Sequence, residues 1–281
     1  YEKCRMKDKI TVIGLGNCGC ALASKFEAYP QYRVLKLDKH PVRARRYFCL
    51  PALEEPERYE KTNIDFKNFF TKVNGEVLFF VGGSGMISNA SLVVLSQIKN
   101  CKIQVVYVKP DRLFLSEIRT LTDNLVFNVF QQYARSGVFE ELLIVNNTEI
   151  EKLLGDVSVV DYYNNINDAV VYSIHTLNSL KRMTPIFGNL SKRLEVSRIS
   201  TVGKVDLETG KETLFFSLDK VREKSYYYII GKKHIEEDKN LLKKIKEQMR
   251  KKYEPTIKIS FGIFESDIDE NFVLCVCLLY T

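Results

Sequence analysis

Two stretches of this chain follow the order strand, glycine turn, helix, and this order restricts the fold more than any other feature. In the first stretch, Ile10–Ile13 is an apolar run of strand length, and the apolar residues of Ala21–Phe26 fall on one face of a helix that we expect to end near Tyr29–Pro30. Glycines let the backbone approach a ligand closely, and the free N–H groups of a helix's first turn attract anions. Many such turns bind nothing, but this order favours a phosphate site made by Gly14, Gly16, Asn17, Cys18, Gly19 and Cys20.

The second stretch repeats the pattern at residues 77–98. The apolar run Val77–Val81 passes directly into a turn, and an apolar helical face follows from Ile87 to Ile98. One such turn can bind a diphosphate, and two turns on one parallel sheet can hold a triphosphate from both sides through backbone N–H groups. A plain tight turn is the alternative. The residues that we expect to bind phosphate here are Gly82, Gly83, Ser84 and Gly85.

Strands and helices alternate through the first 180 residues. Further strand-like runs lie at Tyr32–Asp38, Lys102–Val108 and Leu142–Val145, and long helical patterns separate or follow them. The polar, proline-containing residues 41–66 predict a loop with a short helix. The alternation predicts an α/β fold with a doubly wound, Rossmann-like parallel sheet. Ligands of such sheets bind beyond the carboxyl ends of the strands, where both glycine turns lie.

The pattern changes after Leu180. A hairpin between residues 198 and 217, a strand at Ser225–Ile230, a charged amphipathic helix over Ile235–Tyr253 and two final strands indicate a smaller α+β unit. We therefore expect a nucleotide-binding domain, a long central helix and a C-terminal α+β domain, at residues 1–157, 158–180 and 181–281.

Composition argues against several classes of function. No apolar run reaches the roughly 18 residues that a membrane-spanning helix needs, so we expect no membrane partner. The seven cysteines contain no Cys-x-x-Cys pair, and there are three histidines, which predicts reduced thiols in a cytoplasmic protein without a metal held by its own side chains. The net charge of +7 is moderate, and the basic run at 243–252 is typical of a solvated helix face. Nucleic acid is therefore not an expected partner.

One acidic residue leaves a second class of nucleotide open. Asp38 ends the second strand, 19 residues after Gly19. The spacing Gly-x-Gly-x-x-Gly, followed by an acid about 20 residues later, is the dinucleotide fingerprint, in which the carboxylate binds ribose hydroxyls. The residues alone therefore allow an NAD-binding protein as well as a triphosphate-binding one, with Asp38 at the ribose.

The order of the elements, from about Lys9 to Thr281, resembles the tubulin/FtsZ superfamily of filament-forming GTPases. Residues 14–20 resemble that family's first phosphate loop. Phe80–Gly85 resembles the first half of its Gly-Gly-Gly-Thr-Gly-Thr-Gly signature, although Met86 and Ile87 replace the Thr and Gly that follow. The last strands and helix, which include Phe261-Gly262, resemble its closing segment, for which a dehydrogenase has no use. The resemblance implies GTP or GDP as ligand, Mg²⁺ held through the phosphates, and self-association into filaments or oligomers.

Three further positions match nucleotide contacts of that family. Val105–Pro110 resembles the strand before its ribose loop and implies a nucleotide contact for Arg119, although Leu115 stands where the family has a glutamate. Tyr163–Val170 resembles the start of its central helix, where an aromatic ring stacks on guanine and an amide or acid four residues later binds the base edge. These roles fall on Tyr163 and Asn167, which share one helix face.

The loop that supplies the family's catalytic acids is altered. The family hydrolyses GTP across a subunit junction, and a loop of pattern Asn-x-Asp-x-x-Asp polarises the attacking water. Gly188–Leu194 matches this loop, but Ser191 and Leu194 occupy the two acid positions, and neither side chain can act as a base. We expect weak or absent GTP hydrolysis and name no catalytic residue. A nucleotide-free protein of this fold that caps or inhibits filaments is a further alternative.

Overall fold

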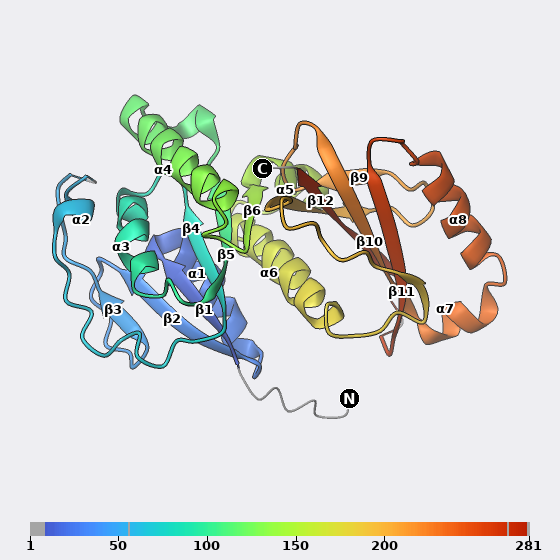
Figure 1. The fold of residues 1–281 in the computed structure, drawn as a ribbon, viewed down its shortest axis with the longest axis horizontal. Helices are drawn as coiled ribbons and strands as arrows, with labels where there is room; N and C mark the ends of the chain where they lie inside the picture. Colours follow the sequence, from blue (N-terminus) through green and yellow to red (C-terminus); the bar gives the residue numbers. More distant parts are fainter. Residues whose placement is uncertain (1–8, 56, 269, 280–281) are drawn as a thin grey trace.

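The computed structural model describes residues 9–55, 57–268 and 270–279 as one continuous twelve-stranded sheet with helices on its faces (Figure 1). The first eight residues of the predicted nucleotide-binding domain, Cys4 among them, lie outside the described residues. The strands are β1 Ile10–Leu15, β2 Tyr32–Asp38, β3 Tyr47–Cys49, β4 Glu76–Gly82, β5 Lys102–Lys109, β6 Glu141–Asn146, β7 Phe187–Asn189, β8 Ile199–Val205, β9 Glu212–Leu214, β10 Val221–Gly231, β11 Lys258–Ser266 and β12 Phe272–Leu279. The α-helices are α1 Gly16–Lys25, α2 Arg58–Lys61, α3 Ser91–Ser96, α4 Glu117–Arg135, α5 Asn147–Leu154, α6 Tyr162–Leu180, α7 Lys232–Glu237 and α8 Leu241–Lys251. Short 3₁₀ helices are η1 Phe26–Ala28, η2 Met86–Ala90 and η3 Arg112–Phe114.

The sheet has a parallel half and a mixed half. Its order is β3-β2-β1-β4-β5-β6-β8-β12-β10-β11-β7, with β9 paired to β8. All neighbours from β3 to β6 are parallel, which confirms the predicted doubly wound sheet. In the C-terminal half the pairs are antiparallel except for β10 with β11. The two halves meet where β6 pairs with β8 through only Leu142–Ile199 and Leu143–Ser200.

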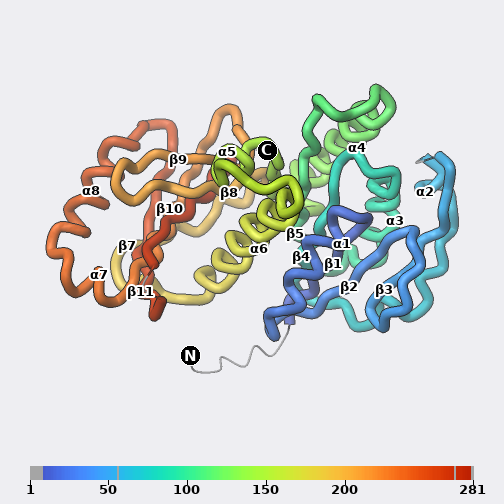
Figure 2. The backbone as a smooth tube through the Cα atoms, turned by 180° about the vertical axis from the view of Figure 1, so that it is seen from behind, coloured from blue at the N-terminus to red at the C-terminus, as the bar shows by residue number. Residues whose placement is uncertain are grey.

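Helices cover both faces of the parallel half. One apolar cluster contains the buried faces of α1 and α6, and another contains those of α3 and α4 on the opposite face. The α6 cluster also includes Tyr227, Ile229 and Leu274 of the mixed half, so α6 packs against both halves of the sheet. Figures 1 and 2 show α6 running between the two halves from either side. A third cluster, with Ile245 of α8, covers the outer face of the mixed half.

Several local expectations were wrong. Residues 235–253 form two helices, α7 and α8, because the Asp238 carboxylate accepts the Asn240 N–H at 2.8 Å and stabilises a turn between them. Residues 41–66 contain the short edge strand β3 as well as the helix α2. The helix after the second glycine turn begins as the 3₁₀ helix η2 before α3. Helix α5 was not expected, although Asn146 caps it by accepting the Thr148 N–H at 2.8 Å.

Two glycines of the first turn are required by packing. A Cβ atom on Gly14 would lie 2.3 Å from the Gly19 carbonyl oxygen, and a Cβ on Gly19 would lie 2.3 Å from the Phe80 carbonyl oxygen. Backbone atoms cannot rotate out of the way as a flexible side chain can. These glycines therefore let β1, α1 and β4 approach one another more closely than any side chain would permit.

We expect Gly14→Ala to lower the free energy of unfolding by about 2–4 kcal/mol, because the new methyl group meets backbone on α1. Gly85→Ala is the matched control. Gly85 has a φ of −75° and only the Ser88 hydroxyl nearby, so its replacement should change stability by less than about 1 kcal/mol. Urea unfolding followed by circular dichroism measures both. Equal stabilities of the two variants would contradict the packing role of Gly14.

Candidate functional site

The first glycine turn places the open N-terminus of α1 at the carboxyl edge of the sheet. Helix α1 begins at Gly16, directly after β1, and Gly16 has a φ of +70°, which favours glycine. Leu15 at the N-cap offers no side-chain hydrogen bond, and the first turn contains no acidic residue. The first N–H groups of a helix have no partner within the helix, so here they are left for an external acceptor.

The second glycine turn follows β4. The Gly83 N–H donates to the Val108 carbonyl at 3.0 Å, so this donor is already used within the sheet edge. The Ser88 N–H donates to the Gly85 carbonyl at 2.9 Å, and the Ser88 hydroxyl donates to the Gly82 carbonyl, which closes the turn. Ser84 is half-buried and Gly85 is exposed at the tip of the turn. Backbone available to a ligand is therefore concentrated at Ser84 and Gly85.

The two turns lie side by side. Strands β1 and β4 are parallel neighbours, and their registers bring Leu15 opposite Val81. A Cβ atom on Gly82 would lie 3.1 Å from the Cys18 Cβ atom. Burial raises the pKa of the Cys18 thiol to about 12. The first turn of α1 thus meets the base of the second turn, and an anion at the edge of the sheet could contact both.

A buried ion pair that the sequence analysis missed supports the second turn. The Lys109 Nζ atom, on β5, donates to the Asp123 Oδ2 atom at 2.9 Å, and the Tyr107 hydroxyl donates to Asp123 Oδ1 at 2.7 Å. Asp123 is completely buried on α4, and a Cβ atom on Gly83 would lie 2.0 Å from its Oδ1 atom. Burial lowers the pKa of Lys109, although Asp123 raises it. The sequence signal that could have predicted this ion pair is Asp123, an acid on the core-facing side of α4.

Arg119 lies on the helix that carries Asp123, the residue beside Gly83. It is exposed, in the first turn of α4, whose N-terminus is capped by Ser116. Residues four apart share a helix face, so Arg119 lies one turn before Asp123, the residue that contacts Gly83. Among the described residues, Arg119 makes no side-chain contact with either glycine turn. Its predicted role at the nucleotide is compatible with this position and is otherwise untested.

Tyr163 and Asn167 lie in the first two turns of α6. Tyr163 is 68% exposed, and its ring meets the Tyr162 ring edge-on at 5.1 Å, whereas Asn167 is half-buried. Helix α6 is joined to α1 by Lys25, which donates to the Asn164 and Asp168 side chains, each at 2.6 Å. The same helix that carries Tyr163 and Asn167 is thus fixed against the helix that begins at the first glycine turn.

Asp38 ends β2 beside the first turn. It is 8% exposed, and its Oδ1 atom accepts the Lys39 N–H at 2.7 Å. Its negative charge raises the pKa of the Cys20 thiol, after the larger effect of burial, so Asp38 lies close to α1. Strand β3 pairs beside it, with Cys49 opposite Asp38. The carboxylate is therefore near the turn but mostly covered.

The 188–195 loop, which we expect to match the catalytic loop of the family, lies at the amino ends of the parallel strands, opposite the glycine turns. Arg193 donates to the Glu140 carbonyl at 2.8 Å and pairs with the Glu141 carboxylate at 3.1 Å, both at the start of β6. Ser191 and Leu194 line a cavity of about 1030 Å³ together with Glu76 at the start of β4. The glycine turns, in contrast, follow the carboxyl ends of β1 and β4. Within one copy of the chain, this loop therefore cannot reach a nucleotide bound at the turns.

Two buried acids near the loop, Glu141 and Glu223, are already engaged by neighbouring side chains. Burial alone would raise the pKa of Glu141, but Lys181, Arg193 and Ser200 lower it overall. The Glu223 carboxylate is buried and accepts the Ser197 hydroxyl at 2.6 Å. Glu195 is the one acid within the segment 187–195. The loop therefore has no carboxylate side chain at position 191 or 194.

The residues around the glycine turns fit a phosphate better than a metal held by protein. Both carboxylate oxygens of Asp123 are occupied by Tyr107 and Lys109, and Asp38 is mostly covered. Asp123 therefore has both oxygens engaged, and Asp38 presents little of its carboxylate to the turns. A Mg²⁺ ion would therefore be held by the phosphates of a nucleotide and by water, as this ion commonly is.

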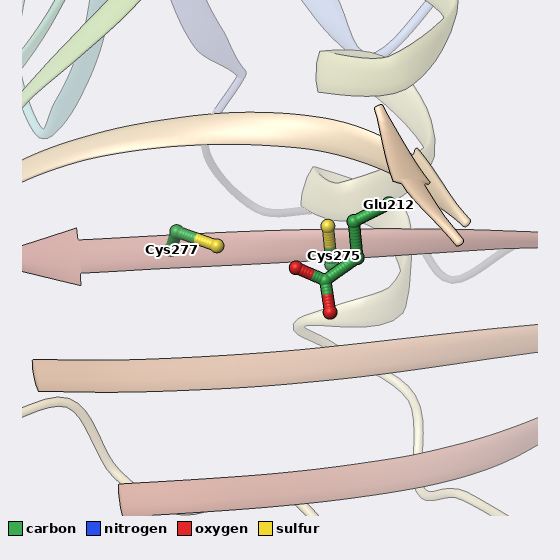
Figure 3. A group of neighbouring side chains, drawn as sticks. All are labelled: Glu212, Cys275 and Cys277. Carbon is green, nitrogen blue, oxygen red and sulfur yellow. The ribbon is translucent and has the colours of Figure 1, made fainter. Parts of the chain in front are cut away.

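A second group of potential metal ligands lies in the mixed half of the sheet. Glu212, Cys275 and Cys277 place one ligand atom each within 4.8 Å of one another (Figure 3). The Glu212 carboxylate, however, pairs with Lys224 at 2.9 Å and with Lys252, and it accepts the Tyr226 hydroxyl at 2.7 Å. Two ammonium groups beside the carboxylate oppose a bound cation. We interpret this group as a buried charged cluster with two reduced thiols.

No helix in the described part of the chain combines the length and apolar character needed to cross a bilayer.

Comparison with known proteins identifies the fold. No protein-family model matches the sequence, and no curated protein matches it by sequence. Several solved structures do match. An empty FtsZ dimer of M. jannaschii has 13% identity, a TM-score of 0.68, and coverage of 97% of this chain and 88% of that one. A GTPγS-form TubZ protofilament of Bacillus thuringiensis serovar israelensis has 16% identity, a TM-score of 0.68, and coverage of 97% and 86%. GDP-bound monomeric CetZ1 of Haloferax volcanii has 15% identity, a TM-score of 0.67, and coverage of 97% and 94%.

These likenesses show that the chain has a tubulin/FtsZ-like fold over nearly its whole length. The resemblance inferred from the sequence is thereby confirmed for the fold. The assignments of individual nucleotide-contacting residues stay predictions.

The thiols of the first turn should react slowly in the folded protein. Burial raises the pKa of Cys18 and of Cys20 to about 12, so few molecules carry the reactive thiolate at pH 8. Among the described cysteines, we expect N-ethylmaleimide to label exposed Cys49 first, and Cys18 and Cys20 only after unfolding in urea. Peptide mapping by mass spectrometry gives the order of labelling. Early modification of Cys18 in the native protein would contradict the closed packing of the two turns.

Proposed function

We propose that this protein binds a guanine nucleotide at the paired glycine turns and assembles head to tail into filaments or oligomers, with slow or absent hydrolysis. The observation that carries the proposal is the position of the two turns. The uncapped N-terminus of α1 and the tip of the second turn lie side by side at the carboxyl edge of a parallel sheet.

The solved structures of similar fold support the choice of ligand. The matching TubZ structures are GTPγS-form and GDP-form protofilaments, and the matching CetZ1 structure is bound to GDP. In the proposed complex, backbone N–H groups near residues 16–20 and at Ser84 and Gly85 hold the phosphates. Arg119 contacts the nucleotide, Tyr163 stacks on the base, and Asn167 donates to and accepts from its edge. Mg²⁺ is bound through the phosphates.

Self-association follows from the placement of the glycine turns and the 188–195 loop. The turns lie at the carboxyl edge of the parallel strands, and the loop lies at the amino edge. If the loop meets a nucleotide, that nucleotide belongs to another copy, and such a head-to-tail contact repeats into a filament. The exposed side chains Val159 and Val160, 92% and 91% accessible, lie just before Tyr163 and supply apolar surface beside the nucleotide. The matching FtsZ and TubZ structures are dimers and filaments.

A charge in the first turn of α1 tests nucleotide binding without disturbing the fold. Asn17 is exposed there, so Asn17→Asp should stabilise the helix slightly while repelling phosphate, and we expect at least a tenfold loss of GTP affinity. Asn147→Asp, in the first turn of α5, is the matched control and should leave affinity unchanged. Titration with a fluorescent GTP analogue and Mg²⁺ measures both.

The same titration separates the ligand classes. Unlabelled GTP should displace the analogue, and NAD should not. Equal GTP affinity of Asn17→Asp and the wild-type chain would contradict binding at the turns. Displacement by NAD alone would instead favour the dinucleotide alternative with Asp38 at the ribose.

Hydrolysis should be slow and independent of assembly. Ser191 and Leu194 replace the expected acids, and the nearby Glu141 and Glu223 are buried and engaged, so the two expected positions offer no carboxylate to activate water across a junction. Glu195 is adjacent to Leu194, but it does not occupy either position. In a phosphate-release assay, we expect turnover per molecule to stay constant as protein concentration rises through the assembly range, which light scattering defines. Brisk turnover that rises with concentration would overturn this expectation.

A further inference from the structure

Helix α4 carries an apolar line on the side that faces away from the protein. Its core-facing residues include Asp123, Val126, Phe130 and Ala134. On the outward side, Ile118, Leu121 and Leu125 are 73%, 59% and 51% exposed. Phe114 of η3, just before the helix, is 84% exposed. We call Phe114, Ile118, Leu121 and Leu125 the α4 stripe.

The stripe is not the edge of the core. Residues 118, 121, 125, 128, 132 and 135 follow one another at three- and four-residue intervals, so they form a single line on the helix. The first three are Ile, Leu and Leu, whereas the last three are Asn128, Gln132 and Arg135, and all six are exposed. An ordinary solvated face would be polar along the whole line. The apolar first half therefore indicates a contact surface. Figures 1 and 2 show α4 at the periphery of the molecule.

The chemistry of the stripe selects a protein partner. The charged residues around the stripe are Asp111, Arg112, Glu117 and Arg119, two acids and two bases, so it lacks the excess of lysines and arginines that flanks a membrane-surface helix. The same balance of charge argues against nucleic acid. Depletion of charge around aromatic and aliphatic side chains is the composition found at the centre of protein interfaces.

We propose that the α4 stripe binds the same stripe of a second copy of this chain, in an antiparallel, two-fold contact. Helix α4 begins at Glu117, after the extended residues Leu115 and Ser116, so helical spacing relates Ile118, Leu121 and Leu125 but not Phe114. An antiparallel pair centred between Ile118 and Leu121 places Ile118 of one copy against the second copy's Leu121. A two-fold contact of this kind uses one patch on both copies.

The exposed area is sufficient for such a contact. The stripe with neighbouring Leu113, which is 88% exposed, presents on the order of 700 Å² per copy. A standard protein interface buries about 800 Å² per partner. The stripe belongs to residues 114–125, and it does not include the glycine turns or the 188–195 loop. The α4 contact therefore needs no nucleotide, although Arg119, which we propose at the nucleotide, lies next to Ile118 on the same helix.

Sedimentation velocity in buffer with EDTA and without nucleotide tests the contact. We expect the wild-type chain to form dimers, and the double variant Ile118→Glu, Leu121→Glu to dissociate with at least a tenfold higher Kd. The matched control Asn128→Glu, Gln132→Glu adds the same charge to the polar half of the same line and should leave the Kd unchanged. Circular dichroism confirms that all three fold. A monomeric wild-type chain at about 100 µM, or equal dimerisation of both double variants, overturns the proposal.

Cross-linking tests the two-fold geometry. Leu121→Cys is placed in a Cys4→Ser, Cys49→Ser background, because Cys49 is exposed and Cys4 lies outside the described residues. A short bismaleimide should link Cys at 121 of one copy to the same position of another, and Gln132→Cys in that background should link poorly. Dimers that form without this link, or that link equally at both positions, contradict an antiparallel contact centred on α4.

Discussion

The contact of backbone with backbone at Gly14, Gly19 and Phe80 is the constraint on which the site depends. Because neither glycine has a side chain, α1 starts directly at the end of β1 and lies against β4. That closeness brings the first turn of α1 beside the second glycine turn, which follows β4. A methyl group at either glycine would push the helix away from the sheet and separate the two sets of N–H groups. The position of the proposed nucleotide is thus a consequence of close packing within the sheet edge.

Much of the parallel half could be predicted from the sequence because its signals are local. Apolar runs such as Val77–Val81 alternate with amphipathic helices, and glycines mark where strands end. This pattern is sufficient for the sheet and for both turns. The break between α7 and α8 depends on one hydrogen bond from Asn240 to Asp238, and a helical pattern that runs across the break hides it. The edge strand β3 has only three residues, too few to show an alternation.

The part of the site that could not be predicted is made by residues distant in sequence. Tyr107, Lys109 and Asp123 meet through β5 and α4, and no spacing rule connects them to Gly83. From the sequence we expected all three glycines of the first turn to serve the ligand. In the structure, Gly14 and Gly19 allow close backbone packing, and Gly16 adopts the positive φ that the turn requires. The roles of Tyr163 and Asn167 rest on resemblance, since base recognition depends on a ligand that no sequence pattern positions.

Added salt should affect the buried pair of Lys109 and Asp123 less than it affects exposed charges. Dissolved ions screen exposed charges within about 10 Å at 0.1 M but act weakly on charges withdrawn from water. Asp123 is fully buried and Lys109 is 6% exposed, so the support beneath Gly83 is insulated from the medium. The phosphates of the proposed nucleotide, at the edge of the sheet, would be in contact with these ions. Added potassium chloride should therefore weaken the binding of that nucleotide while the packing beneath Gly83 stays unchanged.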